Sequence, residues 1–141
     1  MSEINWAALQ QAAQQAAAQA YAPYSKFPVG VAVLADSGKI YTGCNVENAS
    51  YGGTVCAERN AIGAAVVAGE RKFSALLVYT PQAMLTPPCG ICRQVIAEFF
   101  NPDAPIASCN HLQQQQDWTL GELLPAAFTP TYLANSTKVG A

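Results

Sequence analysis

The hydrophobic positions of the chain fall into short segments whose periods predict helices and strands in alternation. Residues 3–20 repeat apolar side chains near a period of 3.6, which is typical of a helix lying on a sheet, and Ser2 is a candidate cap. Two strand-like runs, 29–35 and 40–46, flank a turn signal at 36–39. The chain therefore opens with a helix followed by a β-hairpin.

The middle of the chain continues this alternation. A helix is expected from residue 54 or 55 to residue 68, with Gly69 as its stop signal. The largely apolar run 73–79 predicts a central strand. After a proline-rich loop, a helix is expected over 89–99 and a short strand over 105–108. This order predicts an α/β fold with a mixed sheet between helices.

The end of the chain is less regular. Residues 111–117 contain four consecutive glutamines and predict an exposed loop or turn. Thr119 and Glu122 have the spacing of a capping box, which predicts a short helix. From Thr129 onward the pattern is weak. Because no internal repeat and no dividing linker is visible, we expect residues 1–141 to form one domain.

Composition and charge narrow the function. Hydrophobic residues make up 51% of the 141 residues and charged residues only 11%, against roughly a quarter in average soluble domains. This favours burial of surface between subunits, with an alanine-rich monomer as the alternative. The net charge is −2 and the seven Lys and Arg residues form no cluster. We therefore expect a small, near-neutral substrate rather than a polynucleotide partner.

The cysteines point to metal chemistry in a reducing compartment. Neither a signal peptide nor a membrane-spanning run is visible, so we expect a cytoplasmic protein without a membrane partner. Five cysteines are an odd number, and clustered thiols in such a compartment indicate metal binding or catalysis rather than disulfides.

Three of these thiols lie where predicted helices begin. Cys89 and Cys92 are three residues apart and so share one face of a helix, and Cys56 lies 33 residues upstream. Helix N-termini lower thiol pKa values, which favours ionisation onto a cation. Three thiolates with an open fourth position are typical of a catalytic zinc site.

A pair of cysteines spaced in this way is by itself a weak signal. It is also found in redox pairs and in structural zinc sites, which need a fourth Cys or His ligand. The candidates for that ligand are Cys44, Cys109 and His111. Cys44 also suits a small core position, and His111 suits an exposed loop.

Charged neighbours favour catalysis over a purely structural site. Glu58, two residues after Cys56, is placed to move protons for a metal-bound water. The alternative is an ordinary first-turn glutamate that is stabilised by the helix dipole. Arg59 and Arg93 are placed to donate to the sulfurs and temper their charge.

Five blocks of sequence, in order, resemble the small homotetrameric cytidine deaminases. They are FPVG at 27–30, GCNVENASYG at 43–52, CAER at 56–59, PCGICRQ at 88–94 and ELLP at 122–125. The resemblance implies a three-layer α/β/α sandwich around a mixed five-stranded sheet. It also implies hydrolytic deamination of cytidine and deoxycytidine to uridine and deoxyuridine with release of ammonia, a step of pyrimidine salvage.

The resemblance assigns roles at the reacting centre. It makes Cys56, Cys89 and Cys92 the ligands of Zn²⁺. Glu58 becomes the proton shuttle between the zinc-activated water and the pyrimidine. The backbone of Ala57 is expected to read the edge of the base.

Further positions match the family's contacts with the nucleoside. Asn45 and Glu47 match the pair that binds the ribose hydroxyl, although a solvated turn is the alternative on the residues alone. Phe27 matches the aromatic residue that packs on the base, with a plain core residue as the alternative. Tyr51 and Phe128 match residues near a neighbouring subunit's site, so the resemblance implies a homotetramer with shared active sites.

Some positions depart from the family pattern, and other functions remain open. Pro87 stands where a Ser or Thr is expected, Ile91 replaces a commonly small residue, and Gly53 replaces a larger apolar one. The alternatives are a deaminase of another aminopyrimidine such as blasticidin S, a polynucleotide deaminase, and a non-catalytic zinc-binding interaction module. A fourth protein ligand for the metal would favour the last of these.

Overall fold

The computed structural model describes residues 3–136, which build one five-stranded sheet with strand order β2-β1-β3-β4-β5. The strands are β1 (Gly30–Ala35), β2 (Ile40–Cys44), β3 (Phe73–Thr80), β4 (Pro105–Asn110) and β5 (Gln115–Thr119). The α-helices are α1 (Trp6–Ala17), α2 (Ala57–Val67), α3 (Gly90–Phe99), α4 (Leu120–Leu123) and α5 (Pro130–Ser136). A single 3₁₀ turn, η1 (Tyr51–Gly53), precedes α2.

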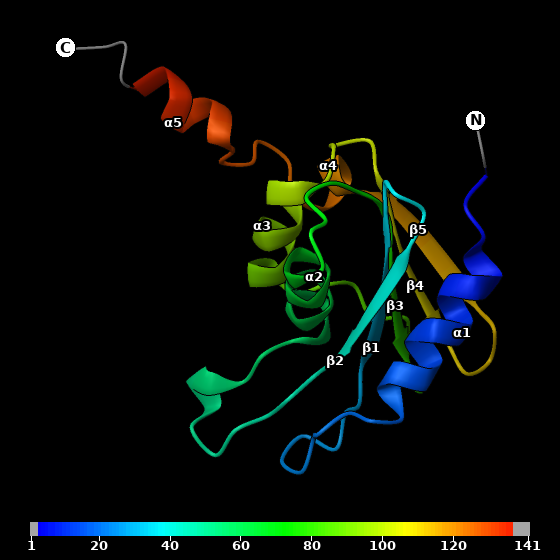
Figure 1. The fold of residues 1–141 in the computed structure, drawn as a ribbon. Helices are drawn as coiled ribbons and strands as arrows, with labels where there is room; N and C mark the ends of the chain where they lie inside the picture. The colour runs from blue at the N-terminus through cyan, green and yellow to red at the C-terminus, as the bar shows by residue number, and fades with distance from the viewer. Residues whose placement is uncertain (1–2, 137–141) are drawn as a thin grey trace.

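Helices cover both faces of the sheet, as Figure 1 shows, so the predicted three-layer arrangement is confirmed. On one face α1 packs through small residues, and Leu9 and Ala13 are buried with Leu77 of β3. On the other face α2 and α3 cover the sheet, where Ala61 and Ile96 join the larger hydrophobic cluster. The alanines allow the helices to approach the sheet closely.

The sheet is mixed. β1 pairs antiparallel with both β2 and β3, β3 pairs parallel with β4, and β4 pairs antiparallel with β5. The end of β2 and the end of β3 lie at one edge, because Gly30 pairs with both Cys44 and Tyr79. The parallel strand β4 ends at the same edge. Crevices beyond the carboxyl ends of parallel strands are common ligand sites.

Two glycines let helices touch the sheet. A Cβ atom at Gly30 would lie 2.0 Å from the carbonyl oxygen of Ala13 in α1. A Cβ atom at Gly43 would lie 2.4 Å from the backbone nitrogen of Ala61 and 2.6 Å from the carbonyl oxygen of Ala57, both in α2. The start of α2 is therefore fixed directly on β2.

The structure confirms most predicted elements and corrects others near the C-terminal end. The capping box of Thr119 and Glu122 is present in both directions, and Gly69 follows α2 with a φ of 101°. The predicted loop at 111–117 is partly wrong, because Gln115 begins β5, an exposed strand at the sheet edge. The weakly patterned end contains α5.

The first helix is shorter than the sequence predicts. It begins at Trp6, and the Asn5 side chain accepts a hydrogen bond from the Ala8 backbone nitrogen at 3.1 Å. The predicted cap Ser2 lies outside the described residues. Within residues 3–136, no helix is both long and apolar enough to cross a membrane.

Candidate metal and active site

Two helix starts bring three thiols together. Cys56 is the N-cap of α2 and Cys89 is the N-cap of α3, while Cys92 lies in the first turn of α3. Their sulfur atoms all lie within 4.8 Å of one another. The Cys56 and Cys89 sulfurs are 3.8 Å apart, and those of Cys89 and Cys92 are 3.3 Å apart.

This cluster fits a zinc ion with three protein ligands. A Zn–S distance of about 2.3 Å in a tetrahedral site places sulfurs about 3.8 Å apart, which matches the Cys56–Cys89 separation and is somewhat longer than the Cys89–Cys92 separation. Among the described residues, no fourth Cys, His or carboxylate joins the group. The alternative fourth ligands lie elsewhere: Cys44 ends β2 outside the group, Cys109 is buried with the α1 side of the core, and His111 is exposed. The arrangement is that of an open site rather than a closed structural one.

The environment of the thiols favours an anion. The pKa of Cys56 is lowered to about 5, chiefly because the Cys92 thiol donates a hydrogen bond to it and also because Arg59 lies beside it. The pKa of Cys92 is raised correspondingly, first by this shared hydrogen bond and then by burial. One thiolate therefore forms readily, whereas a bound cation is needed to stabilise all three thiols in their ionised form.

The two candidate arginines behave differently. Arg59 donates from Nη2 to the Cys56 sulfur at 3.6 Å and to the Thr54 carbonyl at 3.5 Å, as expected of a sulfur donor. Arg93 does not take that role here. Its Nε donates to the Pro88 carbonyl at 2.7 Å and its Nη1 to the Leu123 carbonyl at 3.0 Å. Arg93 thus ties the loop before α3 to α4.

Glu58 is a buried carboxyl group at the start of α2. It is only 5% exposed, and burial raises its pKa to about 7. It lines a cavity of about 160 Å³ together with the Cys56 and Cys89 thiols. The other lining residues are Val29, Asn45, Thr54, Ala57, Val78, Thr86 and Pro87. A buried acid with a pKa near neutrality beside a metal site suits general acid–base catalysis.

The cavity lies at the sheet edge where β2, β3 and β4 end. The loop after β3 supplies Thr86 and Pro87, and β4 holds this loop in place. The Ser108 hydroxyl accepts from the Thr86 backbone nitrogen at 3.1 Å, and Asn110 Nδ2 donates to the Ala83 carbonyl at 3.2 Å. Both side chains are buried.

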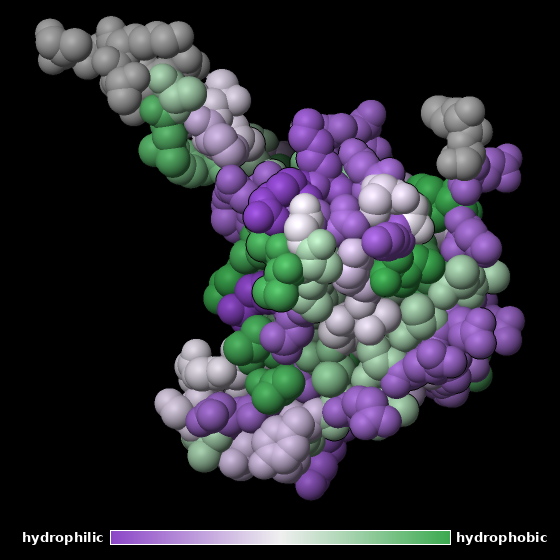
Figure 2. All heavy atoms as spheres, in the orientation of Figure 1, coloured by the Kyte–Doolittle hydropathy of each residue, from purple (hydrophilic) through white to green (hydrophobic). Residues whose placement is uncertain are grey.

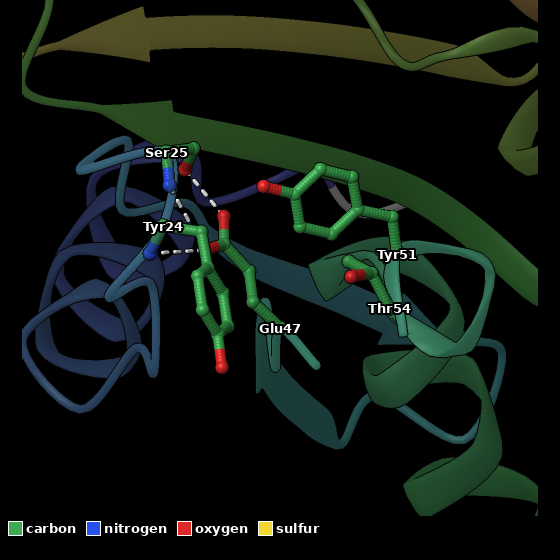
Figure 3. A pocket seen from close by; sticks show the side chains of 5 residues that line it. All are labelled: Tyr24, Ser25, Glu47, Tyr51 and Thr54. Atoms are coloured by element: carbon green, nitrogen blue, oxygen red, sulfur yellow. Dashed lines mark hydrogen bonds between the residues drawn. The ribbon is translucent and has the colours of Figure 1, made fainter. Parts of the chain in front are cut away.

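The predicted sugar-binding pair is divided between two adjoining cavities. Asn45 is buried in the first cavity, where Nδ2 donates to the Phe27 carbonyl and Oδ1 accepts from the Val29 nitrogen, both at 2.9 Å. Glu47 lies in a second cavity of about 230 Å³ with Tyr24, Ser25, Tyr51 and Thr54 (Figure 3). Thr54 lines both cavities, so the two lie next to each other.

The aromatic candidates surround these cavities at different depths. Phe27 is half-buried, and its backbone is held by Asn45. Tyr51 is 76% exposed, lines the second cavity and packs at a tilt against Tyr24. Phe128 is 57% exposed and stacks on Tyr132, with ring centroids 5.7 Å apart.

Sequence reasoning overlooked Ser25 and Thr54. Both are small hydroxyl residues without a metal-ligating or charged group, so nothing in their type marked them. Their neighbours carried the only signal, since Thr54 lies just before Cys56 and Ser25 lies in the aromatic, proline-containing loop before β1.

Comparison with known proteins identifies the family. The family model described as the cytidine and deoxycytidylate deaminase zinc-binding region matches residues 5–107. The cytidine deaminase of Sporosarcina psychrophila is 50% identical over 125 residues, which are 89% of this chain and 92% of that protein. The cytidine deaminase of Mycobacterium tuberculosis H37Rv is 43% identical over 128 residues, covering 91% and 92%.

Solved structures show the same fold. The crystal structure of cytidine deaminase from Burkholderia pseudomallei superposes with a TM-score of 0.84 at 43% identity, covering 89% of this chain and all of that one. The cytidine deaminase of Mycobacterium tuberculosis gives a TM-score of 0.79 at 42% identity, covering 89% and 98%. The predicted family and its zinc dependence are thereby confirmed. The chain belongs to the zinc-binding cytidine and deoxycytidylate deaminase family.

Proposed function

We propose that this chain catalyses the hydrolytic deamination of cytidine and deoxycytidine, giving uridine or deoxyuridine and ammonia, as a step of pyrimidine salvage. One observation carries the proposal: the Cys56, Cys89 and Glu58 side chains converge on one cavity at the sheet edge. Relatives with high identity over most of their length are cytidine deaminases. The cavity volume of about 160 Å³ suits a single small ring.

The proposed roles follow from position. Cys56, Cys89 and Cys92 would hold Zn²⁺, a Lewis acid that would lower the pKa of a water toward 7 and so supply the nucleophile. Glu58 carries both protons of the water in turn: the first goes to the ring nitrogen, and the second goes to the amine, which leaves as ammonia when the C–N bond breaks. Arg59 stabilises the Cys56 thiolate, since it donates to that sulfur.

The nucleoside is held by the residues around the two cavities. The Ala57 backbone reads the base edge and Phe27 packs on the base, while Asn45 and Glu47 receive the sugar. Pro87 lines the first cavity, and a proline keeps the carbonyl that this position would direct at the amine. The departure at Pro87 is therefore compatible with the reaction.

We further propose a homotetramer in which Tyr51 and Phe128 reach a neighbouring subunit's site. Large apolar side chains are also exposed on the helices. Figure 2 shows hydrophobic residues in green over α2, α3 and α5. Among them Val67 is 90% exposed and Ile91 is 64% exposed. Because every strand described joins one sheet, we infer one domain. The five free cysteines favour a reducing compartment such as the cytoplasm.

The test is the ultraviolet absorbance change with cytidine, deoxycytidine, cytosine and blasticidin S, each with and without a metal chelator. We expect turnover of the two nucleosides, little turnover of cytosine, and loss of activity on chelation that zinc restores. Preference for blasticidin S would replace the proposed substrate. A zinc-loaded protein without activity on any of the four would indicate a binding module.

A further inference from the structure

The loop before β1 is held by the segment after β2 through a dense set of hydrogen bonds. Glu47 Oε1 accepts from the backbone nitrogens of Tyr24 at 3.0 Å and Ser25 at 3.1 Å, and Glu47 Oε2 accepts a short hydrogen bond from the Ser25 hydroxyl. Figure 3 shows the carboxylate pointing into the loop, with Tyr51 across the cavity. Most of the carboxylate's acceptor capacity is therefore used within the chain.

The Ser25 hydroxyl connects two residues of the proposed substrate pocket. Its oxygen accepts from the Phe27 backbone nitrogen at 3.0 Å while its proton goes to Glu47. Because the Phe27 N–H occupies an acceptor position of the hydroxyl, it favours the orientation in which the proton faces the carboxylate. The hydroxyl thus links the backbone of the proposed base-packing residue to the proposed sugar-binding carboxylate.

The hydrogen bonds leave a defined position for a ligand. A carboxylate offers about four lone-pair positions, and the three bonds described fill two on Oε1 and one on Oε2. The remaining position is on Oε2, the oxygen that the Ser25 hydroxyl fixes. The pKa of Glu47 is held below its ordinary value, first by the Ser25 side chain, so the group stays an acceptor at neutral pH.

The second cavity is placed to receive a sugar. It lies beside the first cavity, since Thr54 lines both, and so offers neighbouring space for the sugar of a base bound in the first. Among the described residues that line this second cavity, Glu47 is the only one with an acidic side chain.

We propose that Ser25 is a positioning residue for sugar recognition, which holds the Glu47 carboxylate so that its free Oε2 position receives a sugar hydroxyl. The inference rests on the proposed function and adds to it a residue that acts through Glu47. Removing the hydroxyl takes away the bond that fixes Glu47 Oε2, while Oε1 keeps its two backbone donors. Binding of the sugar weakens, whereas Glu58 and the thiols are untouched.

Kinetics of Ser25→Ala with cytidine and with 2′,3′-dideoxycytidine test this. For cytidine we expect KM to rise about tenfold, the size of one charge-assisted hydrogen bond, with kcat within about twofold of the wild type. For the dideoxynucleoside, which lacks both ring hydroxyls, we expect KM to change less than about twofold. Ser25→Thr restores the cytidine KM because it keeps a hydroxyl.

A double-mutant cycle shows whether Ser25 acts through Glu47. In a Glu47→Gln background, Ser25→Ala should add less than about twofold to the cytidine KM, since the partner is already changed. Additive effects, an unchanged cytidine KM, or equal rises with both substrates would overturn the inference. Ser25→Cys, which keeps the size but only a weak donor, gives an intermediate KM and serves the same test if the alanine variant does not fold.

A matched control is Ser37, in the turn between β1 and β2. The Ser37 hydroxyl donates to Glu70 Oε2 at 2.7 Å, a serine–glutamate pair of the same kind away from the cavities. Ser37→Ala should leave both KM values unchanged, and a rise equal to that of Ser25→Ala would indicate a general structural effect and overturn the inference. A wild-type chain inactive on cytidine would instead overturn the proposed function.

Discussion

At the scale of residues, Glu58 combines burial with access to a cavity. Its carboxyl group is 5% exposed, yet it lines the space that the Cys56 and Cys89 thiols also face. Burying a carboxyl group lowers the stability of the fold, because desolvation penalises its charged form. Its position at the first turn of α2 offsets part of that cost through the helix dipole.

Replacing this carboxyl group separates the reaction from the fold. Glu58→Gln should lower kcat for cytidine about 10³-fold, the usual contribution of general acid–base catalysis, because the amide cannot carry the proton. Zinc content and the thermal unfolding midpoint should stay near the wild type. Steady-state kinetics and metal analysis measure both, with exposed Glu98→Gln of α3 as control. A fully active Glu58→Gln enzyme would contradict the assigned role.

The residue types predicted the metal-site thiols better than they predicted the hydrogen bonds of the polar side chains. Cys56, Cys89 and Cys92 are of a residue type that binds metals, and their spacing matches two helix starts that the hydrophobic pattern also indicated. Arg93 was expected to reach a sulfur, but two backbone carbonyls compete for its guanidinium. Ser25 could not be found, because its role depends on how the loop before β1 folds back, with Lys26 at a φ of 58°.

At the scale of elements, the position of α2 on β2 decides where the site begins. Gly43 leaves no space for a side chain between the strand and the helix backbone, as the two close contacts at this position show. The same helix starts with the zinc-site cap Cys56 and with Glu58. Packing at Gly43 is therefore coupled to the geometry of the site.

Adding one methyl group at this contact should have two effects. Gly43→Ala should lower the free energy of unfolding by about 3 kcal/mol, because the helix must move away from the strand. It should also reduce kcat, since α2 carries Glu58. Chemical denaturation and kinetics provide the measurements.

The same helix supplies the control. Gly63 is exposed and a Cβ atom there meets nothing within 4 Å, so Gly63→Ala should raise stability by about 1 kcal/mol with no kinetic effect. Equal stability changes at both glycines would refute the close-packing argument.

Elements with strong periodicity were predictable, and the exceptions have physical reasons. The strand β3 is buried along nearly its whole length and so appears as an apolar run. The strand β5 lies at the sheet edge with Gln115 and Gln116 exposed, and pairing with β4 rather than its own composition makes it a strand. The helix α5 is short and lacks a clear apolar stripe, so its sequence gave no helical signal.

At the scale of the whole molecule, α5 extends away from the body of the sheet (Figure 1). Phe128 and Tyr132 lie at its base, exposed and stacked on each other. Gln94 of α3 donates to the Phe128 carbonyl at 2.8 Å and so anchors this segment. A projecting segment with exposed aromatic rings suits contact with another subunit.

A charge placed on this segment should weaken assembly. Tyr132→Glu should raise the subunit dissociation constant at least about tenfold, because a charge is costly to bury in an apolar interface. Specific activity at low protein concentration should fall in parallel, since Phe128 of one chain would no longer reach its neighbour. Light scattering after size exclusion measures the first effect, with Gln15→Glu at an exposed position of α1 as the control. A fully active monomeric wild type would contradict the shared site.

The placement of the thiols at two helix caps has a consequence for the unfolded chain. Cys56 and Cys89 lie 33 positions apart, and the segment between them contains α2, β3 and the loop lining the active site. An ion bound by both thiols closes this segment into a ring, which removes conformational entropy from the unfolded state worth roughly 4 kcal/mol on the scale used for covalent cross-links. The metal thus also acts as a cross-link for about a quarter of the chain. Losing it exposes the catalytic helix to local opening and proteolysis.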